Sequence, residues 1–420
     1  YGDHRDLHYP LRRQRQMCIR DSGLTIVSEA IPSVRSVSVG VFIKTGTRYE
    51  NKENNGIAHF LEHMVFKGTK KRSAFKIAQS LEEVGGSLNA YTSKELTVYY
   101  AHALDSQLSI CMNVLSDMLC NSLFRDSDIE KEKLVVMEEI SAVRDTPDEY
   151  IFDLFQEQLF PNQPIGYPIL GTSETVKQFN RGTLLEFWGQ HYCPNNIIIS
   201  AAGNLQHDKL IKLAQKNFHF NNIGTSVCFQ RPESAKKIDL EINESVSQSH
   251  ICAGLEALSY LAEERYNLIA VNAYLGGGMS SKLFQVIREK HGLAYSVYSF
   301  VDFYSDTGML SVYLGTDKKN QNKALKILFR ELEKLTKKEI SPPKVNKIKA
   351  HLKGNLLLGL ESSNRRMTRL AKNEIYYGRQ IGLKELVSKI DSISPSTLFE
   401  ISRKIFALDD FNIIKLSPSN

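Results

Sequence analysis

The 420-residue sequence predicts an α+β protein of two homologous lobes, each with an antiparallel-rich sheet packed against helices. Short segments rich in β-branched residues are bounded by turn formers, as strands are. Two pairs of these segments are separated by only a few residues, which is typical of antiparallel hairpins. The order strand, helix, hairpin, helix, helix then occurs a second time, which indicates a duplicated unit. Hairpins mixed with helices favour an α+β class over a doubly wound α/β sheet.

The first lobe is expected to span residues 23–225. β-branched residues predict strands at 24–29 and 37–46, and the polar loop that follows is suited to cap a helix over 56–66. The remaining elements expected here are a helix over 74–85, a hairpin over 87–93 and 96–104, helices over 106–119 and 126–145, and a strand over 196–205. The helix over 126–145 is expected to take its N-cap from Asp126 to Asp128.

The second lobe is expected over residues 241–420, after a linker at 226–240 in a stretch that lacks periodicity and carries Gly, Ser and Pro. It repeats the order of elements of the first lobe. The elements expected are a strand over 249–257, a helix over 265–278, a strand pair within 294–316, and helices over 319–335 and 346–363. Both halves are thus expected to share one architecture.

Composition excludes several classes of function. The net charge of +6 comes from basic residues that are interleaved with acidic ones, which is typical of a solvated surface rather than a nucleic-acid interface. The hydrophobic fraction of 42% is ordinary for a folded globular protein. No apolar run approaches the roughly 18 residues that cross a bilayer. We therefore expect neither nucleic-acid binding nor membrane insertion.

Six cysteines are scattered along the chain without a CxxC pair. This spacing matches neither a dense disulfide framework nor a cysteine zinc site. Reduced and mostly buried thiols indicate a reducing compartment. We expect a cytoplasmic location in a bacterium, or the mitochondrial matrix in a eukaryote.

Residues 1–22 differ from the rest of the chain. They carry five arginines and three aspartates, and their apolar residues follow no steady period. A secretory signal would need an apolar run, and a mitochondrial presequence would be poor in acidic residues. We expect an atypical tail or a sequence artefact and assign this stretch no function.

The stretch His59-Phe-Leu-Glu62-His63 places three chemically active side chains on one helix face. Each helical residue advances about 100 degrees, so these three span an arc of only about 100 degrees. Two neutral imidazoles at i and i+4 can both reach a zinc ion, while the carboxylate between them can hold the water of the metal. Glu62 could then accept the proton of that water and return it to a leaving amine. Two histidines on an ordinary surface helix are the alternative.

A catalytic zinc site with two histidines needs a third protein ligand, which is often a carboxylate. The acidic helix over 126–145 offers four candidates, namely Glu130, Glu132, Glu138 and Glu139. Glu132 and Glu139 are seven residues apart and share a face, so one could ligate zinc while the other orients a ligand. The alternative is a solvated helix face stabilised by charge pairing within the "EKEK" stretch.

The HxxEH motif resembles that of the inverzincins. From Ser22 onward the chain resembles the pitrilysin family of zinc peptidases, especially bacterial members similar to the β subunit of mitochondrial processing peptidase. In that family a helix patterned E-x6-E supplies the third ligand. The resemblance therefore implies zinc ligation by His59, His63 and Glu139, a supporting role for Glu132, and Glu62 as general base.

Three further residues match the family's substrate-binding parts. Asn89 lies in "GGSLNAYTSKELTVYY", which resembles a segment whose edge strand pairs with an extended peptide. Arg288 and Tyr295 match an arginine and a tyrosine that anchor substrate carbonyls and donate to the oxyanion. Without the resemblance, Asn89 would be a turn residue, Arg288 a surface charge and Tyr295 a core aromatic. The glycines at 276–278 lack a following Gly-Lys-Ser/Thr and predict no nucleotide site.

The resemblance implies a zinc-dependent metalloendopeptidase that cleaves unfolded peptides or presequences inside a closed chamber. The second lobe has no HxxEH motif, so one Zn²⁺ per chain is expected. Relatives enclose substrate with four such lobes, so a two-lobed chain is expected to form a homodimer. Arg288 and Tyr295 would then serve either their own zinc site or that of the partner. A non-catalytic structural or partner subunit of the same family, and a heterodimeric enzyme, are the alternatives.

Overall fold

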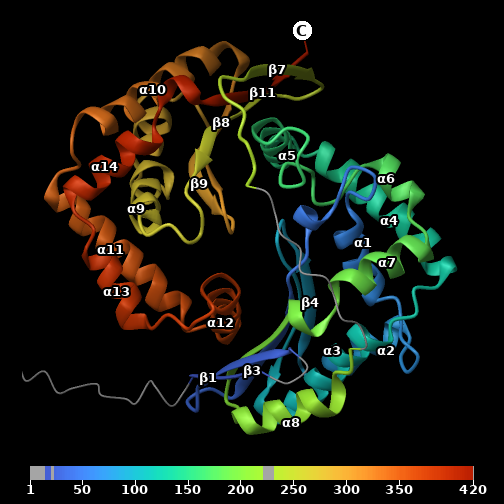
Figure 1. Ribbon diagram of the computed structural model, residues 1–420. Coiled ribbons are helices and arrows are strands. Elements are labelled where there is room, and N and C mark those ends of the chain that lie inside the picture. The colour runs from blue at the N-terminus through green and yellow to red at the C-terminus, as the bar shows by residue number, and fades with distance from the viewer. Residues whose placement is uncertain (1–14, 20–22, 221–230, 420) are drawn as a thin grey trace, which may run out of the picture.

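A computed structural model describes residues 15–19, 23–220 and 231–419, and it consists of two lobes that lie side by side (Figure 1). Each lobe is built on a sheet with one parallel strand pair and otherwise antiparallel neighbours. Helices cover both faces of each sheet. The predicted α+β class with two related lobes is confirmed.

The first sheet has six strands in the order β1-β2-β6-β3-β5-β4. The strands are β1 (Arg15–Ile19), β2 (Thr25–Ala30), β3 (Ser36–Ile43), β4 (Ser87–Thr92), β5 (Thr97–Leu104) and β6 (Ile197–Gly203). The predicted hairpin forms β4 and β5, which pair from Ser87 opposite His102 to Thr92 opposite Thr97. Within the described residues β4 pairs only with β5, so it forms one edge of the sheet.

The helices of the first half are α1 (Ile57–Val65), α2 (Ala74–Glu82), α3 (Leu108–Asn121), α4 (Asp126–Arg144), α5 (Pro147–Leu159), α6 (Ser173–Gln178), α7 (Arg181–His191) and α8 (His207–Asn217). One face of the sheet packs against α1, α3 and α8 through a large apolar core that includes Val39 and Leu115. The N-cap of α4 is Arg125, without a side-chain cap bond, so the predicted cap at Asp126 to Asp128 is wrong. Asp126 and Asp128 instead lie in the first turn, where their charge complements the helix dipole.

The second sheet has five strands in the order β7-β11-β8-β10-β9. The strands are β7 (Asp239–Glu244), β8 (Ser249–Ala257), β9 (Ser296–Phe303), β10 (Gly308–Thr316) and β11 (Asn412–Pro418). The helices are α9 (Arg265–Gly276), α10 (Gln321–Lys337), α11 (Pro342–Gly359), α12 (Ser363–Tyr377), α13 (Leu383–Asp391) and α14 (Pro395–Ile405), with a π-helical segment η5 (Phe284–Lys290) after α9. Apart from β1, the strand order matches that of the first sheet element by element, as expected for a duplicated unit.

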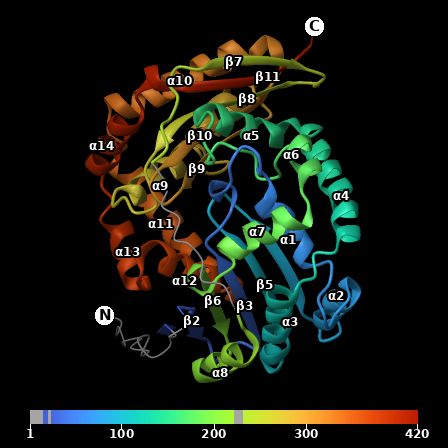
Figure 2. The same cartoon turned by 45° about the vertical axis from the view of Figure 1, so that its right-hand side comes forward.

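Two helices cross between the lobes (Figure 2). Helix α5 belongs to the first half of the chain, yet Ile151 and Phe155 pack on the second sheet against Tyr313 of β10. Helix α12 belongs to the second half, yet Met367 and Leu370 pack on the first sheet. Each sheet therefore has one face covered by a helix from the other half. The predicted lobe boundaries at 225 and 241 remain predictions, because residues 221–230 lie outside the described residues.

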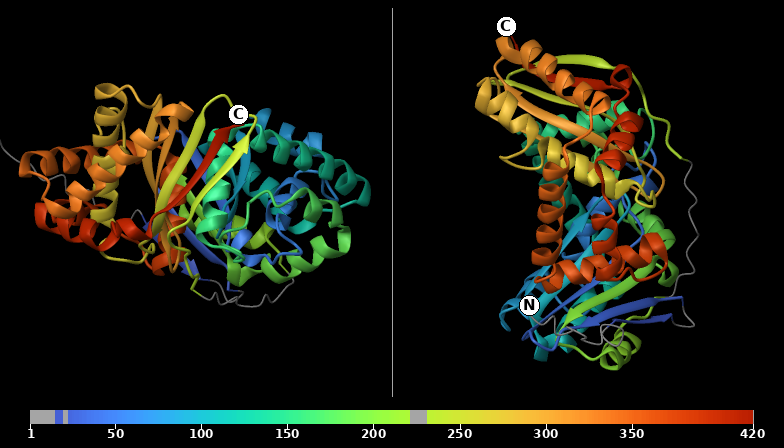
Figure 3. Two further views of the ribbon diagram at one scale, coloured as in Figure 1. Left: turned by 90° about the horizontal axis from the view of Figure 1, so that it is seen from above. Right: turned by 90° about the vertical axis from the view of Figure 1, so that its left-hand side faces the viewer.

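The N-terminal stretch differs from expectation in one respect. Residues 15–19, which lie within the stretch expected to be an atypical tail or a sequence artefact, form the edge strand β1 and pair antiparallel with β2. Residues 1–14 and 20–22 lie outside the described residues. In Figure 3 the red strand β11 lies beside the yellow-green strand β7 in the second sheet.

The described residues contain no helix that combines the length and the apolar composition needed to cross a bilayer.

Candidate metal centre

The helix that carries the histidine motif, α1, begins at a tightly constrained loop. Its N-cap is Gly56, whose φ of 93° is left-handed, and a Cβ there would lie 2.6 Å from the carbonyl oxygen of Leu170. The cap comes from Glu50, whose carboxylate accepts the N–H groups of Gly56 (2.8 Å) and Ala58 (2.9 Å). Burial raises the pKa of Glu50 to about 7, although these donors act in the opposite direction. The start of α1 is thus fixed just ahead of the motif.

Two imidazoles of α1 and one carboxylate of α4 converge. The Nε2 atoms of His59 and His63 lie 3.8 and 3.6 Å from Oε2 of Glu139. Ligand atoms of all three residues lie within 4.8 Å of one another. Ligands about 2.0 to 2.1 Å from a tetrahedral zinc ion would stand roughly 3.3 Å apart. The two carboxylate–imidazole distances therefore need to shorten by only a few tenths of an ångström around a divalent metal ion, and the two imidazoles lie within 4.8 Å of each other.

Glu132, one of the four glutamates considered above, holds His63 in place. Its Oε1 lies 2.8 Å from His63 Nδ1, and its other oxygen forms an ion pair with Lys67. If Nδ1 is the donor, the Nε2 lone pair of His63 is left facing Glu139. Burial raises the pKa of Glu132, but the hydrogen bonds from His63 and Lys67 outweigh it, so the net shift is downward. The carboxylate therefore stays charged and can orient the ring.

The two histidines have different electrostatic surroundings. Burial and the neighbouring His63 lower the pKa of His59 to about 3, so His59 is neutral near pH 7, as a metal ligand must be. Its Nδ1 is buried and has no hydrogen-bond partner among the described residues. Burial also lowers the pKa of His63, but the hydrogen bond with Glu132 and the nearby carboxylates reverse the sign. A bound cation would displace the proton that these carboxylates favour.

Glu62 lies beside the three convergent residues and is oriented by a strand. The hydroxyl of Thr92, the last residue of β4, donates to Glu62 Oε2 at 2.5 Å. Burial raises the pKa of Glu62 more than the bond from Thr92 lowers it. A carboxylate with a raised pKa is a better proton acceptor, which suits the role predicted for Glu62.

The four residues face an open hollow of about 440 Å³. One wall is the edge strand β4, through residues 90–92. Helix α5 adds two more carboxylates, Glu149 and Asp153, one helical turn apart. Asn89 lies on β4 beside this wall, but it is exposed, and its Oδ1 accepts the N–H of Ala90. The hollow is therefore acidic and bordered by an unpaired strand edge.

The other acidic candidates of α4 do not reach the histidines. Glu138 is exposed, and Glu130 pairs with Lys133 at 2.7 Å on the solvent side. Only Glu139 joins the two imidazoles, and only Glu132 supports one of them. The seven-residue spacing that distinguishes this pair in the sequence corresponds to two turns of one helix face.

Arg288 and Tyr295 lie together in the second lobe but away from the hollow. The guanidinium carbon of Arg288 lies 4.9 Å from the ring centroid of Tyr295 and 4.8 Å from that of Phe284. Tyr295 is 74% exposed, so it is not the core aromatic that its pattern suggests. Neither residue lines the metal hollow. Within one described chain the structure does not bring them to the histidines.

Several residues at the site were missed by sequence reasoning. Thr92, Lys67, Glu149 and Asp153 all contact or line the centre, but they come from three segments that meet only in the folded chain. Lys67 had a usable signal, because it follows His63 by only four residues, although α1 ends before it at Val65. The other three carry no local pattern that separates them from surface residues.

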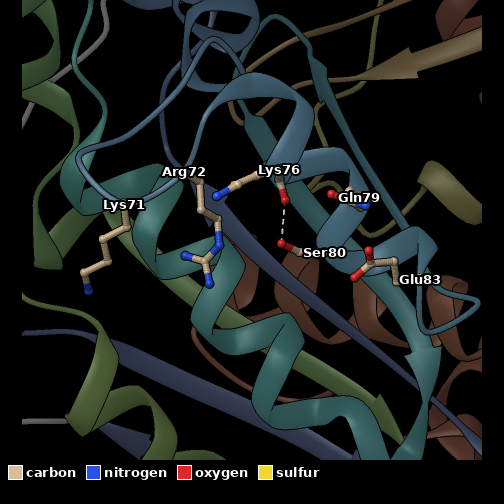
Figure 4. Close-up of a pocket in the computed structure, with 6 residues that line it drawn as sticks. All are labelled: Lys71, Arg72, Lys76, Gln79, Ser80 and Glu83. Atoms are coloured by element: carbon tan, nitrogen blue, oxygen red, sulfur yellow. Dashed lines mark hydrogen bonds between the residues drawn. The ribbon is translucent and has the colours of Figure 1, made fainter.

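A second hollow, lined by Lys71, Arg72, Lys76, Gln79, Ser80 and Glu83, lies beside α2 (Figure 4). The charge of Arg72 is already engaged, because its guanidinium donates to Asp117 (2.7 Å) and Asn113 (2.6 Å). Figure 4 shows Ser80 turned back to the carbonyl of Lys76 at 2.5 Å. This hollow brings together no set of metal-binding side chains.

Two family models match the chain. Residues 25–173 match the model described as insulinase, peptidase family M16, and residues 178–352 match the model described as the peptidase M16 inactive domain. The range matched by the first model includes His59, Glu62, His63 and Glu139. The range matched by the second lies largely in the half of the chain that lacks the motif.

Curated relatives match over nearly the whole chain. The uncharacterized zinc protease YmxG of Bacillus subtilis is 40% identical over 399 residues, which cover 95% of this chain and 97% of that protein. The uncharacterized zinc protease SCO5738 of Streptomyces coelicolor is 35% identical and covers 91% of this chain and 85% of its own length.

The fold also occurs in solved structures. A protease from Helicobacter pylori superposes with a TM-score of 0.91 at 22% identity and covers 96% of this chain and 99% of its own. An M16-like peptidase from Alicyclobacillus acidocaldarius gives a TM-score of 0.86. The likeness to the pitrilysin peptidases that the HxxEH motif suggested is thus confirmed, and the chain belongs to the insulinase peptidases of family M16.

Proposed function

We propose that this chain is a zinc-dependent endopeptidase that cuts unfolded peptides inside an enclosed chamber. The observation that supports this most strongly is the convergence of His59, His63 and Glu139, with Glu62 facing the same hollow. The relatives from Bacillus subtilis and Streptomyces coelicolor carry the name zinc protease. Membership of a peptidase family fits a hydrolytic role for these four side chains.

One zinc ion per chain would be held by His59, His63 and Glu139. Among the described residues they form the one group of three potential ligands that meets in space. When bound, zinc supplies Lewis acidity, which polarises the scissile carbonyl and lowers the pKa of a water molecule toward about 7. Glu132 keeps His63 turned toward the ion through the bond at Nδ1.

Glu62 would carry the proton. Its carboxylate removes a proton from the attacking water and returns it to the leaving amine. Thr92 fixes one carboxylate oxygen, which leaves the other oxygen available for the transfer. The raised pKa of Glu62, caused by burial, brings its basicity closer to the working pH.

The substrate would bind as an added strand on β4. The edge of β4 offers unpaired backbone groups next to the metal hollow, and such an edge binds the main chain of an extended peptide regardless of most side chains. Asn89 lies on this edge and is exposed. Glu149 and Asp153 would favour a basic residue near the cleaved bond, because their two negative charges border the hollow.

The complete enzyme would be a homodimer whose lobes enclose the chamber. Arg288 and Tyr295 are stacked on each other and lie apart from the hollow of their own chain. A second copy facing the first would let them reach the partner's metal centre, where an arginine and a phenol can stabilise the oxyanion. This arrangement would give the second lobe a catalytic role despite its lack of a metal motif.

The direct test is digestion of a peptide library by the native protein and by the Glu62→Gln variant, with and without a chelator. We expect the native protein to cut near basic residues and to lose activity when zinc is removed. Glu62→Gln should retain zinc and lose at least about 100-fold in kcat, because the proton carrier is gone. Zinc content is measured by elemental mass spectrometry.

Glu138→Gln is the matched control, because Glu138 is the exposed neighbour of Glu139 on the same helix. It should keep both zinc and activity, whereas Glu139→Gln should lose zinc. Full activity in Glu62→Gln would reject the mechanism. Intact zinc binding with no cleavage of any peptide would instead favour the non-catalytic subunit.

A further inference from the structure

The turns of two equivalent hairpins, one from each lobe, meet in the interior. Residues 93–96 connect β4 to β5, and residues 304–307 connect β9 to β10. The backbone N–H of Ser305 donates to both carboxylate oxygens of Glu95 at 3.1 Å, and the Ser305 hydroxyl donates to Oε1 at 2.7 Å. Glu95 is only 6% exposed, so this contact lies out of solvent. The turn beside the metal hollow is thus bound directly to the second lobe.

Arg48 bridges the two lobes at the same place. One guanidinium nitrogen donates to Glu95 at 2.6 Å, and the other donates to Asp306 at 2.6 Å. Its backbone N–H also donates to the carbonyl of Lys94 at 2.8 Å. The hydroxyl of Tyr376, on the exchanged helix α12, adds a third contact to Glu95 at 3.0 Å. We name Arg48, Glu95, Ser305, Asp306 and Tyr376 the hairpin junction.

The hairpin junction is costly to build from charges. Arg48 is 5% exposed, and moving charged groups out of water carries a desolvation penalty that apolar residues would avoid. Apolar packing already joins the lobes through α5 and α12. Directional hydrogen bonds add what apolar contacts lack, because they fix the two turns at one distance and angle. The hairpin junction is therefore better suited to fixing the relative position of the two turns than to increasing the free energy of unfolding.

The position of the β4–β5 turn affects Glu62 through two links, first to Thr92 and then to Glu62 itself. Thr92 is the last residue of β4, and the next residue, Ser93, closes the turn through its N–H bond to Leu96 at 2.8 Å. The hydroxyl of Thr92 holds Glu62. A shift of the turn would therefore move the Thr92 hydroxyl and the wall of the hollow together.

We propose that the hairpin junction is a positioning device through which the second lobe sets the placement of Thr92 and Glu62. This rests on the proposed peptidase function, since Glu62 is the residue to be placed. Arg48, Glu95, Ser305, Asp306 and Tyr376 touch neither substrate nor metal and act only through the β4–β5 hairpin. The half of the chain without the HxxEH motif thereby contributes to catalysis within its own chain.

Two variants test the device. Asp306→Ala removes one carboxylate from Arg48 while leaving Glu95 in place, and Tyr376→Phe removes a single hydroxyl. In both, kcat should fall about 10- to 100-fold while KM and zinc content stay within about twofold, because misplacement affects the transition state. Glu385→Gln is the control, since it removes a carboxylate from Arg379 in an exposed pair of the second lobe. It should leave kcat unchanged.

A double-variant test with Thr92 distinguishes a positioning role of the hairpin junction from a general loosening of the fold. If the hairpin junction acts through Thr92, the double variant of Asp306→Ala with Thr92→Val should lose little more in kcat than the more damaging single variant. Losses that multiply would overturn the proposal. So would an unchanged kcat in both Asp306→Ala and Tyr376→Phe.

A measurement without activity uses the metal-free protein. Hydrogen exchange at the amides of residues 90–97 should be at least about tenfold faster in Asp306→Ala than in the native chain, while exchange in α3 stays the same. Equal exchange rates in both regions would contradict the proposal. Failure of the peptidase function itself would appear separately, as full activity in Glu62→Gln.

Discussion

At the scale of single residues, we expect one carboxylate beside the candidate metal centre to support metal binding without being a ligand. Glu132 is 2% exposed and binds both His63 and Lys67. A charged acceptor at Nδ1 fixes both the tautomer and the rotation of an imidazole ligand. The affinity for zinc should therefore respond to Glu132 nearly as it does to the ligands.

We expect Glu132→Gln to weaken zinc binding by about 10- to 100-fold, because the neutral amide holds His63 less firmly and leaves Lys67 without its partner. Competition with a chromogenic chelator measures this affinity. Glu130→Gln is the control on the same helix, since Glu130 is largely exposed and pairs only with Lys133. Equal zinc affinity in the native chain and Glu132→Gln would show that His63 is oriented by other contacts.

A second residue-scale prediction concerns His191, which lies away from the metal centre. It is 3% exposed, packs against Phe187 with ring centroids 4.3 Å apart, and its Nδ1 has no hydrogen-bond partner among the described residues. Burial lowers its pKa to about 4. Between pH 6.5 and 4 the unfolded chain binds the proton more readily, so stability is complete above pH 6.5 and falls as the pH drops toward 4.

The shift from 6.5 to about 4 corresponds to about 3 kcal/mol of folding free energy. His191→Phe should therefore flatten the loss of stability between pH 6.5 and 4, as measured by urea denaturation of the metal-free protein. His219→Phe is the control, since His219 is exposed. The same pH slope in His191→Phe and the native chain would contradict the expectation.

Some residues of the candidate site could be predicted from the sequence and others could not. Helical phase alone brings His59, Glu62 and His63 together, because all three belong to one short helix. The choice of Glu139 among four glutamates needed the family resemblance, since its partners His63 and His59 lie 76 and 80 residues earlier in the chain. Thr92 was out of reach, because nothing local indicates that a strand threonine faces a helix glutamate.

At the scale of elements, the hairpins and the repeated order of strands and helices were predictable, since alternation and turn residues are local signals. The packing of α5 and α12 each on the sheet of the other half was not predictable. The apolar stripe of α5 contains Ile151, Phe155 and Leu159 at four-residue intervals, which predicts burial but not which sheet is covered. That choice depends on contacts with strands that come about 100 to 260 residues later in the chain.

The packing of α5 on the second sheet leads to a prediction for Phe155. This fully buried ring packs on the second sheet, where a Cβ added at Gly254 would lie 2.9 Å from its Cζ. Phe155→Ala should cost about 3 to 5 kcal/mol, as cavities left by buried aromatic rings do. Hydrogen exchange should show the loss in β8 and β11 of the second lobe, although Phe155 belongs to the first half.

Phe75→Ala provides the control for Phe155→Ala. Phe75 is 72% exposed on α2, so its truncation should change the unfolding free energy by less than about 0.5 kcal/mol. Loss of protection confined to the first sheet in Phe155→Ala would show that α5 does not stabilise the second lobe.

At the scale of the whole molecule, Arg288 and Tyr295 do not line the metal hollow of their own chain, so we expect a second chain to complete the active site. If these residues serve the partner, two inactive variants should complement each other. A mixture of Glu62→Gln and Arg288→Ala chains forms mixed dimers in which one site has Glu62 from one chain and Arg288 from the other.

With random pairing, half of the dimers are mixed and each has one of two sites intact, so activity should return to about a quarter of the native value. Peptide cleavage after mixing and subunit exchange measures it. Glu62→Gln mixed with Glu139→Gln is the control and should stay inactive, because both changes damage the same side of the site. No recovery in the first mixture would place Arg288 with its own zinc.

The reciprocal position of α5 and α12 has a consequence for the integrity of the molecule. A protease that nicked the connection between the lobes would leave two fragments still interlocked, because each buries a helix in the other. Either fragment produced alone would instead expose a bare sheet face, which is the kind of surface that drives aggregation. The peptide link between the halves is therefore dispensable for cohesion, whereas the simultaneous presence of both halves is not.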